Sequence, residues 1–140
     1  MSKKSEIIKT NLELGKKGAA ETIVTERNTA KAVGSGSLDV FATPMMIALM
    51  EQAACDALAD VLEDGQTSVG TNINIDHIAA TPVGMKVTAM AVIESVSGRT
   101  IKFAVSAADK SGKIGTGTHI RAIIDEERFI KKVSEKILTE

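Results

Sequence analysis

The sequence predicts an α+β fold in which an antiparallel sheet curls around one long helix. Residues 45–62 form a strongly helical and mostly apolar segment. After this segment, apolar and polar residues alternate at period two, which is typical of half-buried strands. Short turns separate these strands, so neighbouring strands are expected to form hairpins. A helix that is apolar around most of its circumference is economically buried by a sheet that wraps around it.

The first part of the chain carries weaker patterns than the rest. Residues 1–18 are rich in Lys and weakly patterned, so we expect a peripheral N-terminal segment. Residues 21–26 (ETIVTE) are short and β-prone, and residues 28–39 contain the run GSGS, which indicates a flexible loop.

The central helix has clear start and stop signals. Thr43 can cap it, Pro44 suits the first helical position, and Gly65 ends it. Its polar residues recur at spacings of four, four and three, which places them on one narrow stripe. These residues are Gln52, Asp56, Asp60 and Glu63. The remaining residues of the helix are almost all apolar, which predicts burial around most of the helix, Cys55 included.

Four strands are expected after this helix, over residues 68–77, 85–93, 101–107 and 114–124. Turn signals at residues 95–99 and 109–112 join the last three strands into an antiparallel meander. A meander curled around one helix is the hotdog arrangement. Residues 125–138 complete the chain as a charged helix.

Composition restricts the function. At 140 residues the chain is expected to form one domain over residues 1–140, with residues 127–140 as a peripheral helix. A net charge of −1, with three Phe and no Trp or Tyr, argues against nucleic-acid or anionic-membrane binding. The single cysteine excludes an intramolecular disulfide framework. No signal peptide or membrane-spanning run is visible, so a cytoplasmic protein is expected.

Glu51 is the most informative candidate for chemistry. It lies about 135° around the helix from the centre of the polar stripe, among apolar neighbours. A carboxylate on the buried side of a helix must be paired, hydrogen-bonded or protonated. Catalytic acids and bases occur in such surroundings, although a structural Glu satisfied by the backbone or by a partner subunit is an equal alternative.

Two further residues could join Glu51 in a reaction. His77 ends a strand and has the side chain best suited to moving protons near neutral pH, although an exposed strand-end histidine is the alternative. Thr43 offers a hydroxyl at the start of the helix, where free N–H groups favour an oxyanion, although on its own it is expected to be only a cap.

Glycines and charged residues on two strands are secondary candidates. Gly70 can present a bare N–H to a ligand, and Arg121 could bind an anion or form a salt bridge. The sequence places Gly115, Gly117 and His119 on the same strand face as Arg121. We interpret the two glycines as close packing on the helix and His119 as a satisfied structural histidine. Cys/His metal-ligand spacing, phosphate loops and nucleophile elbows are absent, so neither metal nor redox cofactor is expected.

Three sequence blocks resemble one family. They are residues 41–55 (FATPMMIALMEQAAC), 70–84 (GTNINIDHIAATPVG) and 114–122 (IGTGTHIRA). These blocks, with their spacing, resemble the fluoroacetyl-CoA thioesterase-like hotdog proteins over about residues 19–125. The resemblance implies a catalytic group of Thr43, Glu51 and His77, a glycine near the thioester carbonyl at Gly70, and a strand arginine at Arg121. It also implies a homodimer with active sites at or near the subunit interface.

One segment departs from the family pattern. Members selective for fluoroacetyl-CoA resemble one another in a longer, aromatic-bearing lid before the helix, whereas residues 28–40 here are short, Gly/Ser-rich and free of aromatics. The expected reaction is therefore hydrolysis of a short or medium acyl-CoA, without fluoroacetyl selectivity and with CoA only as part of the substrate.

Two alternatives stay open. A hotdog dimer could bind an acyl-CoA without turnover, although binding alone needs no buried carboxylate beside a proton shuttle. Hydration of an enoyl-CoA by an Asp/His pair ranks third, because Asp76 and His77 are adjacent on a strand and point to opposite faces.

Overall fold

The computed structural model describes residues 12–138, and the expectations for residues 1–11 and 139–140 lie outside this range. Within it the elements are β1 (Lys17–Ile23), α2 (Ala30–Val33), α3 (Thr43–Leu58), β2 (Gln66–His77), β3 (Lys86–Ser97), β4 (Thr100–Asp109), β5 (Gly112–Asp125) and α4 (Glu126–Leu138).

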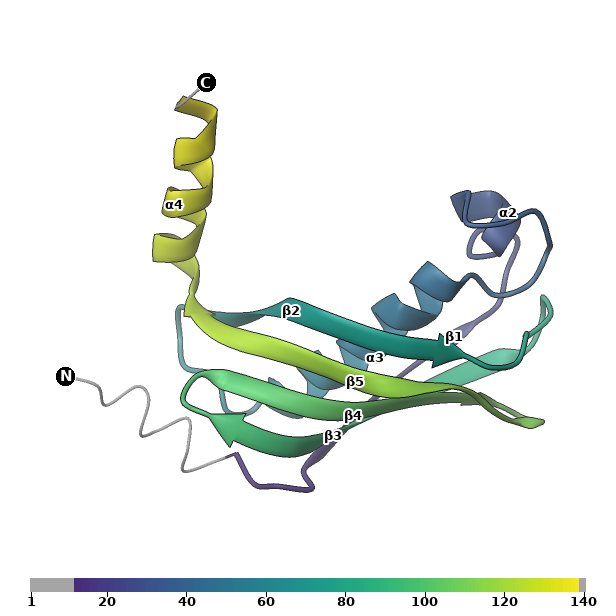
Figure 1. Cartoon of the computed structure of the whole chain (residues 1–140), viewed down its shortest axis with the longest axis horizontal. Coiled ribbons are helices and arrows are strands. Elements are labelled where there is room, and N and C mark those ends of the chain that lie inside the picture. The colour runs from purple at the N-terminus through teal and green to yellow at the C-terminus, as the bar shows by residue number, and fades with distance from the viewer. Residues whose placement is uncertain (1–11, 139–140) are drawn as a thin grey trace.

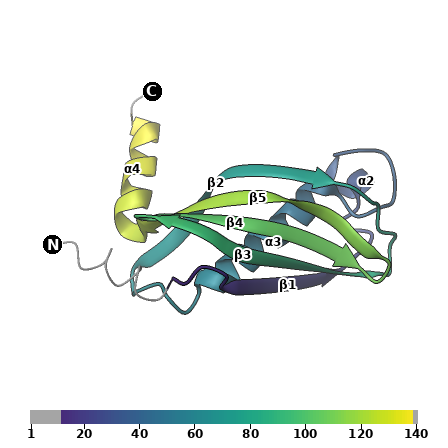
Figure 2. The same ribbon diagram turned by 60° about the horizontal axis from the view of Figure 1, so that its bottom comes forward.

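The five strands form one antiparallel sheet in the order β1-β3-β4-β5-β2 (Figure 1). The sheet curves around α3, which lies across it and packs mainly on β1 and β3 (Figure 2). The predicted α+β hotdog arrangement is therefore confirmed, including the meander of β3, β4 and β5. The sequence did not show that β1 and β2 would become the two edges of the sheet.

Alternation within β3 and β4 explains why the sheet has one apolar face. Every second residue is buried beneath α3 or beside it over residues 87–93 of β3 and 101–107 of β4. These residues are Val87, Ala89, Ala91, Ile93, Ile101, Phe103, Val105 and Ala107. Because side chains of a strand alternate between its two faces, this spacing turns all eight toward the core.

α3 approaches β1 at a glycine. A Cβ at Gly18 would lie 2.1 Å from the Ala53 carbonyl oxygen and 2.4 Å from the Ala57 nitrogen. Only a residue without a side chain allows this approach. On the same side, Asp56 accepts a hydrogen bond from Ala19 N at 3.0 Å, so part of the polar stripe of α3 satisfies the sheet edge.

The central helix differs from its prediction in two ways. It ends at Leu58 rather than residue 62, and Gly65 stands seven residues later with a φ of 84°. It is also less buried than expected, because the flank that carries Ile47, Ala48 and Glu51 is only half-buried. Cys55, expected in the core, is exposed on this flank. The reason is that α3 packs on the β1–β3 half of the sheet, which leaves its β2 side uncovered.

Two segments expected to be loose are tied to the body. Within residues 28–39, which predicted a flexible loop, α2 forms with Thr29 as its N-cap, and Ala30 N donates to Val40 O at 2.8 Å. Leu12, in the expected peripheral segment, is 7% exposed and belongs to the core. Across residues 12–138, no helix is both long enough and apolar enough to traverse a membrane.

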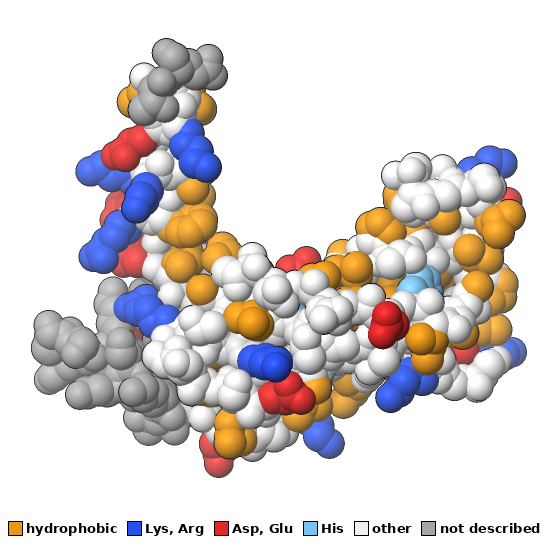
Figure 3. Space-filling model, in the orientation of Figure 1, with side chains coloured by type: hydrophobic (Ala, Val, Ile, Leu, Met, Phe, Trp, Pro, Cys, Tyr) orange, Lys and Arg blue, Asp and Glu red, His pale blue; other side chains and the backbone are white. Residues whose placement is uncertain are grey.

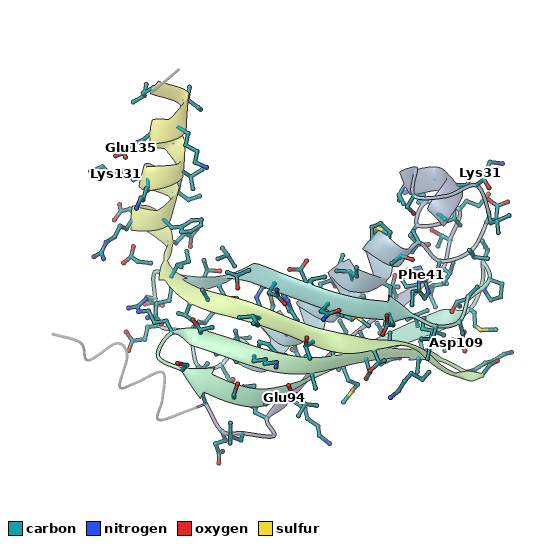
Figure 4. All side chains as sticks on the ribbon, viewed as in Figure 1. Lys31, Phe41, Glu94, Asp109, Lys131 and Glu135 are labelled. Atoms are coloured by element: carbon teal, nitrogen blue, oxygen red, sulfur yellow. The ribbon has the colours of Figure 1, made fainter. Side chains whose placement is uncertain are left out.

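α4 projects from the end of β5 and has no buried residue (Figure 1). Its hydrophobic side chains gather on the side that faces the hollow above β2 (Figure 3). Lys131 and Glu135 lie on the opposite side, pointing away from the body (Figure 4).

Candidate active site

Thr43 and His77 form a hydrogen-bonded pair at the start of α3. The Thr43 Oγ1 atom lies 2.7 Å from Nδ1 of His77, which is the last residue of β2. The helix is capped by Ala42 without a side-chain bond, so the expectation that Thr43 is the cap was wrong. As the first helical residue, Thr43 turns its hydroxyl to the histidine instead of to its own backbone.

The surroundings of His77 favour the neutral imidazole. Burial lowers the pKa of His77 from its ordinary value of 6.5, and the nearby backbone of Ala79 acts in the opposite direction. Its Nε2 atom is buried and makes no hydrogen bond within residues 12–138. A neutral histidine whose Nδ1 accepts from a hydroxyl carries its proton on Nε2, which leaves that N–H for a ligand.

A cleft of about 310 Å³ opens beside this pair. α2, the segment before α3 and the end of β2 supply its lining residues, which are mostly small and apolar. They are Ala30, Ser35, Val40, Phe41, Thr43, His77, Ile78, Ala79 and Ala80. Phe41, 1% exposed, lies two residues before the start of α3 (Figure 4). Mostly apolar walls with a few convergent polar groups are typical of small-molecule sites.

Glu51 belongs to a second cluster, on the same helix. Its Oε2 atom accepts a hydrogen bond from Nη1 of Arg121 at 3.1 Å. Arg121 is itself held by Ser68, whose hydroxyl accepts from Nε at 2.8 Å and whose carbonyl oxygen accepts from Nη2 at 3.1 Å. The salt bridge considered for Arg121 is therefore present, and its partner is the Glu51 carboxylate.

Gly70 provides the space for this carboxylate. A Cβ at Gly70 would lie 2.5 Å from Glu51 Oε2 and 3.3 Å from Arg121 Nη1. The pairing of β2 with β5 shifts register between Gly70 and Asn72, so a bulge follows the glycine. Gly70 and Arg121, which were expected to bind the substrate, thus lie beside Glu51, which was expected to be catalytic.

His119 also belongs to this cluster, although its sequence position was interpreted as that of a structural histidine without a role in the site. It is fully buried, and its Nε2 atom lies 3.1 Å from Arg121 Nη1 and 3.7 Å from Glu51 Oε2. Its position two residues before Arg121 could have indicated that it joins the cluster, because residues two apart on a strand lie on the same face of the sheet.

The two glycines on that face have different neighbours. A Cβ at Gly115 would lie 2.6 Å from Met46 Sδ, which confirms close packing on the helix. At Gly117 the nearest atom is the Asn74 carbonyl oxygen at 2.0 Å, so this glycine permits close approach of β2. The interpretation of Gly117 as a helix contact was wrong.

The structure thus brings the expected site residues together in two groups within one chain. Thr43 and His77 form the first group, and Glu51, Gly70 and Arg121 form the second. Glu51 follows Thr43 by eight residues on α3, which is about 12 Å of helix rise. Among the described residues, no hydrogen bond joins Glu51 to either member of the first pair. The same residues contain no grouping of three His, Cys, Asp or Glu suited to a metal ion.

Comparison with known proteins decides the family. Residues 24–127 match the family model described as fluoroacetyl-CoA-specific thioesterase. The chain belongs to this family of thioesterases. A fluoroacetyl-CoA thioesterase of Streptantibioticus cattleyicolor is 49% identical to it over 98 residues, which cover 70% of each chain. The protein is accordingly an enzyme of the thioester hydrolase class.

Solved structures agree with the family and the fold. The fluoroacetyl-CoA thioesterase FlK matches this thioesterase with a TM-score of 0.85 and 39% identity, over 90% of this chain and 98% of that chain. A Thermus thermophilus hypothetical protein, described as a thioesterase superfamily member, matches with a TM-score of 0.82 and 27% identity, over 91% of this chain and 97% of that chain.

Proposed function

We propose that the thioesterase hydrolyses a short or medium acyl-CoA to the free acid and CoA, with Thr43, Glu51 and His77 as its catalytic group. The observation that carries this proposal is the Thr43–His77 pair, at 2.7 Å, in the wall of a cleft. A relative's structure, described as a variant of the fluoroacetyl-CoA thioesterase FlK in complex with acetyl-CoA, supports an acyl-CoA as the ligand class.

Each member of the group has a role that its chemistry allows. His77 serves as the general base toward the Thr43 hydroxyl or a water and later returns the proton to the departing thiolate. Thr43 is the nucleophile or positions the attacking water. Glu51 provides a fixed negative charge that stabilises the imidazolium or orients water. Gly70 N–H and the start of α3 stabilise the oxyanion, and no metal or redox cofactor takes part.

The cleft bears on the acyl group. Its volume of about 310 Å³ gives room for a short or medium acyl chain beside the Thr43–His77 pair. Ala30, Ser35 and Val40 line it from the segment before α3, where selective family members resemble one another in an aromatic lid. Because this chain has no aromatic residue at 28–40, we propose that it does not select fluoroacetyl-CoA.

A homodimer would complete the site. The open side of the molecule combines the uncovered flank of α3, the free edge of β2 and the apolar face of α4. If two copies place their α3 flanks antiparallel with the symmetry axis at Ile47, Thr43 of one copy faces Glu51 of the other, since each residue is four positions from Ile47. The two groups that are separate in one chain then meet at the interface.

We place this enzyme in the cytoplasm.

Thiol release from a panel of acyl-CoAs tests the reaction. The panel includes acetyl, fluoroacetyl, butyryl, hexanoyl and benzoyl esters. We expect turnover of at least one ester, reduced at least about a hundredfold in His77→Gln and Glu51→Gln, and little changed in the exposed neighbour Asp76→Asn. Binding of CoA esters without cleavage would favour the binding module, and loss of activity in Asp76→Asn with enoyl-CoA turnover would favour hydration.

Mixed dimers test whether the catalytic group spans two subunits. Thr43→Val and Glu51→Gln each inactivate a homodimer, but a heterodimer of the two retains one site with an intact Thr43 and an intact Glu51. Co-expressed, differently tagged chains are therefore expected to regain up to half of the wild-type kcat per dimer. If all three residues act within one subunit, the heterodimer stays inactive.

A further inference from the structure

The cluster around Glu51 contains a buried histidine, His119, that the proposed mechanism does not use. His119 has neighbours on four elements. Its ring stacks on that of Phe103 on β4, with a centroid distance of 6.2 Å, and its Nδ1 atom lies next to the Asn72 carbonyl oxygen on β2. Its Nε2 atom lies next to Arg121 on β5 and Glu51 on α3. Among the described residues, Glu51 and Arg121 are the charged groups that face it.

The two neighbours of the imidazole fix its tautomer. Nδ1 lies 2.8 Å from the Asn72 carbonyl oxygen, which can only accept, so Nδ1 carries the proton. Nε2 lies 3.1 Å from Nη1 of Arg121, which can only donate, so Nε2 is an unprotonated acceptor. Burial is the main cause that lowers the pKa of His119, and the Asn72 carbonyl partly opposes it. The neutral form is the one that this geometry requires.

Arg121 connects the histidine to the carboxylate through one nitrogen. Its Nη1 has two hydrogens, of which one is donated to His119 Nε2 and one to Glu51 Oε2, both at 3.1 Å. Nε and Nη2 are bonded to Ser68, so among the described residues Nη1 is the nitrogen of the guanidinium that contacts both His119 and Glu51. Without the acceptor at Nε2, one buried N–H loses its partner, and the fork can rotate away from Glu51.

We propose that His119 is a positioning residue for Glu51, acting through Arg121: its unprotonated Nε2 holds the guanidinium in the orientation that fixes the carboxylate. This inference rests on the proposed catalytic role of Glu51. A second consequence concerns acid. A proton on Nε2 would oppose the Nη1 donor and would face Glu51 Oε2, only 3.7 Å away, so the carboxylate would exchange Arg121 for the imidazolium.

Two substitutions separate positioning from packing. His119→Gln keeps an acceptor near the place of Nε2, whereas His119→Leu fills the space without one. We expect His119→Leu to lower kcat about tenfold or more with KM little changed, and His119→Gln to stay within about threefold. In an Arg121→Gln background the two variants should no longer differ, because the arginine through which the histidine acts is gone.

Nuclear magnetic resonance gives a readout that needs no turnover. The chain has two histidines, so the imidazole nitrogen spectrum of a His77→Gln variant reports His119 alone. We expect the Nδ1–H tautomer, with the Nε2 shift changed in Arg121→Gln. The carboxyl ¹³C shift of Glu51 should move in His119→Leu and stay near its wild-type value in His119→Gln.

The outcomes are distinct from those of the proposed function. An Nε2–H tautomer, or equal effects of Leu and Gln on both kcat and the Glu51 shift, would overturn the positioning role. If no thioester is cleaved at all, the proposed function fails, and the Glu51 carboxyl shift still decides whether His119 positions that carboxylate.

Discussion

At the residue scale, the two clusters show how burial lowers the pKa of a histidine. Burial is the main cause that lowers the pKa of both His77 and His119, although His77 ends β2 and His119 lies in the middle of β5. Among the described residues, the buried Nε2 of His77 has no hydrogen-bond partner, whereas both nitrogens of His119 are bonded. An unpaired polar atom beside a cleft can bind a ligand, whereas an imidazole with both nitrogens bonded can hold neighbouring side chains in place.

Protonation of these histidines predicts a pH dependence of stability. Their pKa values are lowered from 6.5 in the folded chain, so below about pH 6.5 the unfolded chain binds more protons. The free energy of unfolding therefore has its full value above this pH. It decreases as the pH falls toward the lowered pKa values that the two histidines have in the folded chain. Urea unfolding at pH 8, 6 and 5 measures it, and His119→Gln should show a smaller decrease. Greater stability at pH 5 than at pH 8 would contradict the prediction.

Gly70 offers a second prediction at this scale. In Gly70→Ala the new Cβ would lie 2.5 Å from Glu51 Oε2, so the carboxylate must move away from Arg121. We expect kcat to fall about tenfold or more, with the melting temperature changed by only a few degrees, because the carboxylate can shift toward solvent. Thr71→Ala, the exposed neighbour in the bulge, is the control. Unchanged kcat in Gly70→Ala would show that the position of Glu51 is not critical.

At the element scale, α3 is placed by its contact with β1. This contact sets how much of the helix the sheet covers, and so leaves the Ile47 and Glu51 flank open. Gly18 decides the approach, because a side chain there would meet the backbone of α3. Sequence periodicity located the helix, but it could not show which half of the sheet the helix would cover.

Substitution of Gly18 tests this contact. Gly18→Val should destabilise the fold by at least about 2 kcal/mol, since the clash is with helix backbone that cannot rotate away. Ala19→Val, on the exposed face of the same strand, is the matched control and should change stability by less than about 0.5 kcal/mol. Denaturant unfolding followed by circular dichroism compares the two. Equal stabilities would mean that α3 can shift away from β1 without cost.

At the scale of the whole molecule, hydrophobic side chains of α4 face the same hollow as β2 and the open flank of α3 (Figure 3). The apolar residues of α4 are largely exposed. They are Phe129, Ile130, Val133, Ile137 and Leu138. A helix of 13 residues is marginal in water without packing, so we expect the proposed dimer to cover this face.

Dimerisation should therefore depend on α4. Replacing Phe129 and Val133 by Ser removes apolar surface from the open side and should weaken the dimer at least about tenfold. Replacing Lys131 and Glu135, which point away from the body, by Ser leaves that surface unchanged and is the control (Figure 4). Analytical ultracentrifugation over a concentration series measures both. An equally tight dimer in the first variant would place α4 outside the interface.

The sequence by itself determined the fold class, the position of the central helix and the meander of β3, β4 and β5. These features depend on local periodicity, and the alternation of Val87, Ala89 and Ala91 already specified which face of β3 is buried. Local patterns also offered Glu51, His77 and Thr43 as candidates for chemistry, and the resemblance of three sequence blocks to a thioesterase family predicted them as one catalytic group.

Only the tertiary structure decided how these residues are grouped. That Thr43 bonds His77, and that Glu51 bonds Arg121 beside His119, depends on which strand pairs with which and on where α3 crosses the sheet. These are contacts between residues up to 70 positions apart. Periodicity reports the face on which a side chain lies, whereas long-range packing sets its partners.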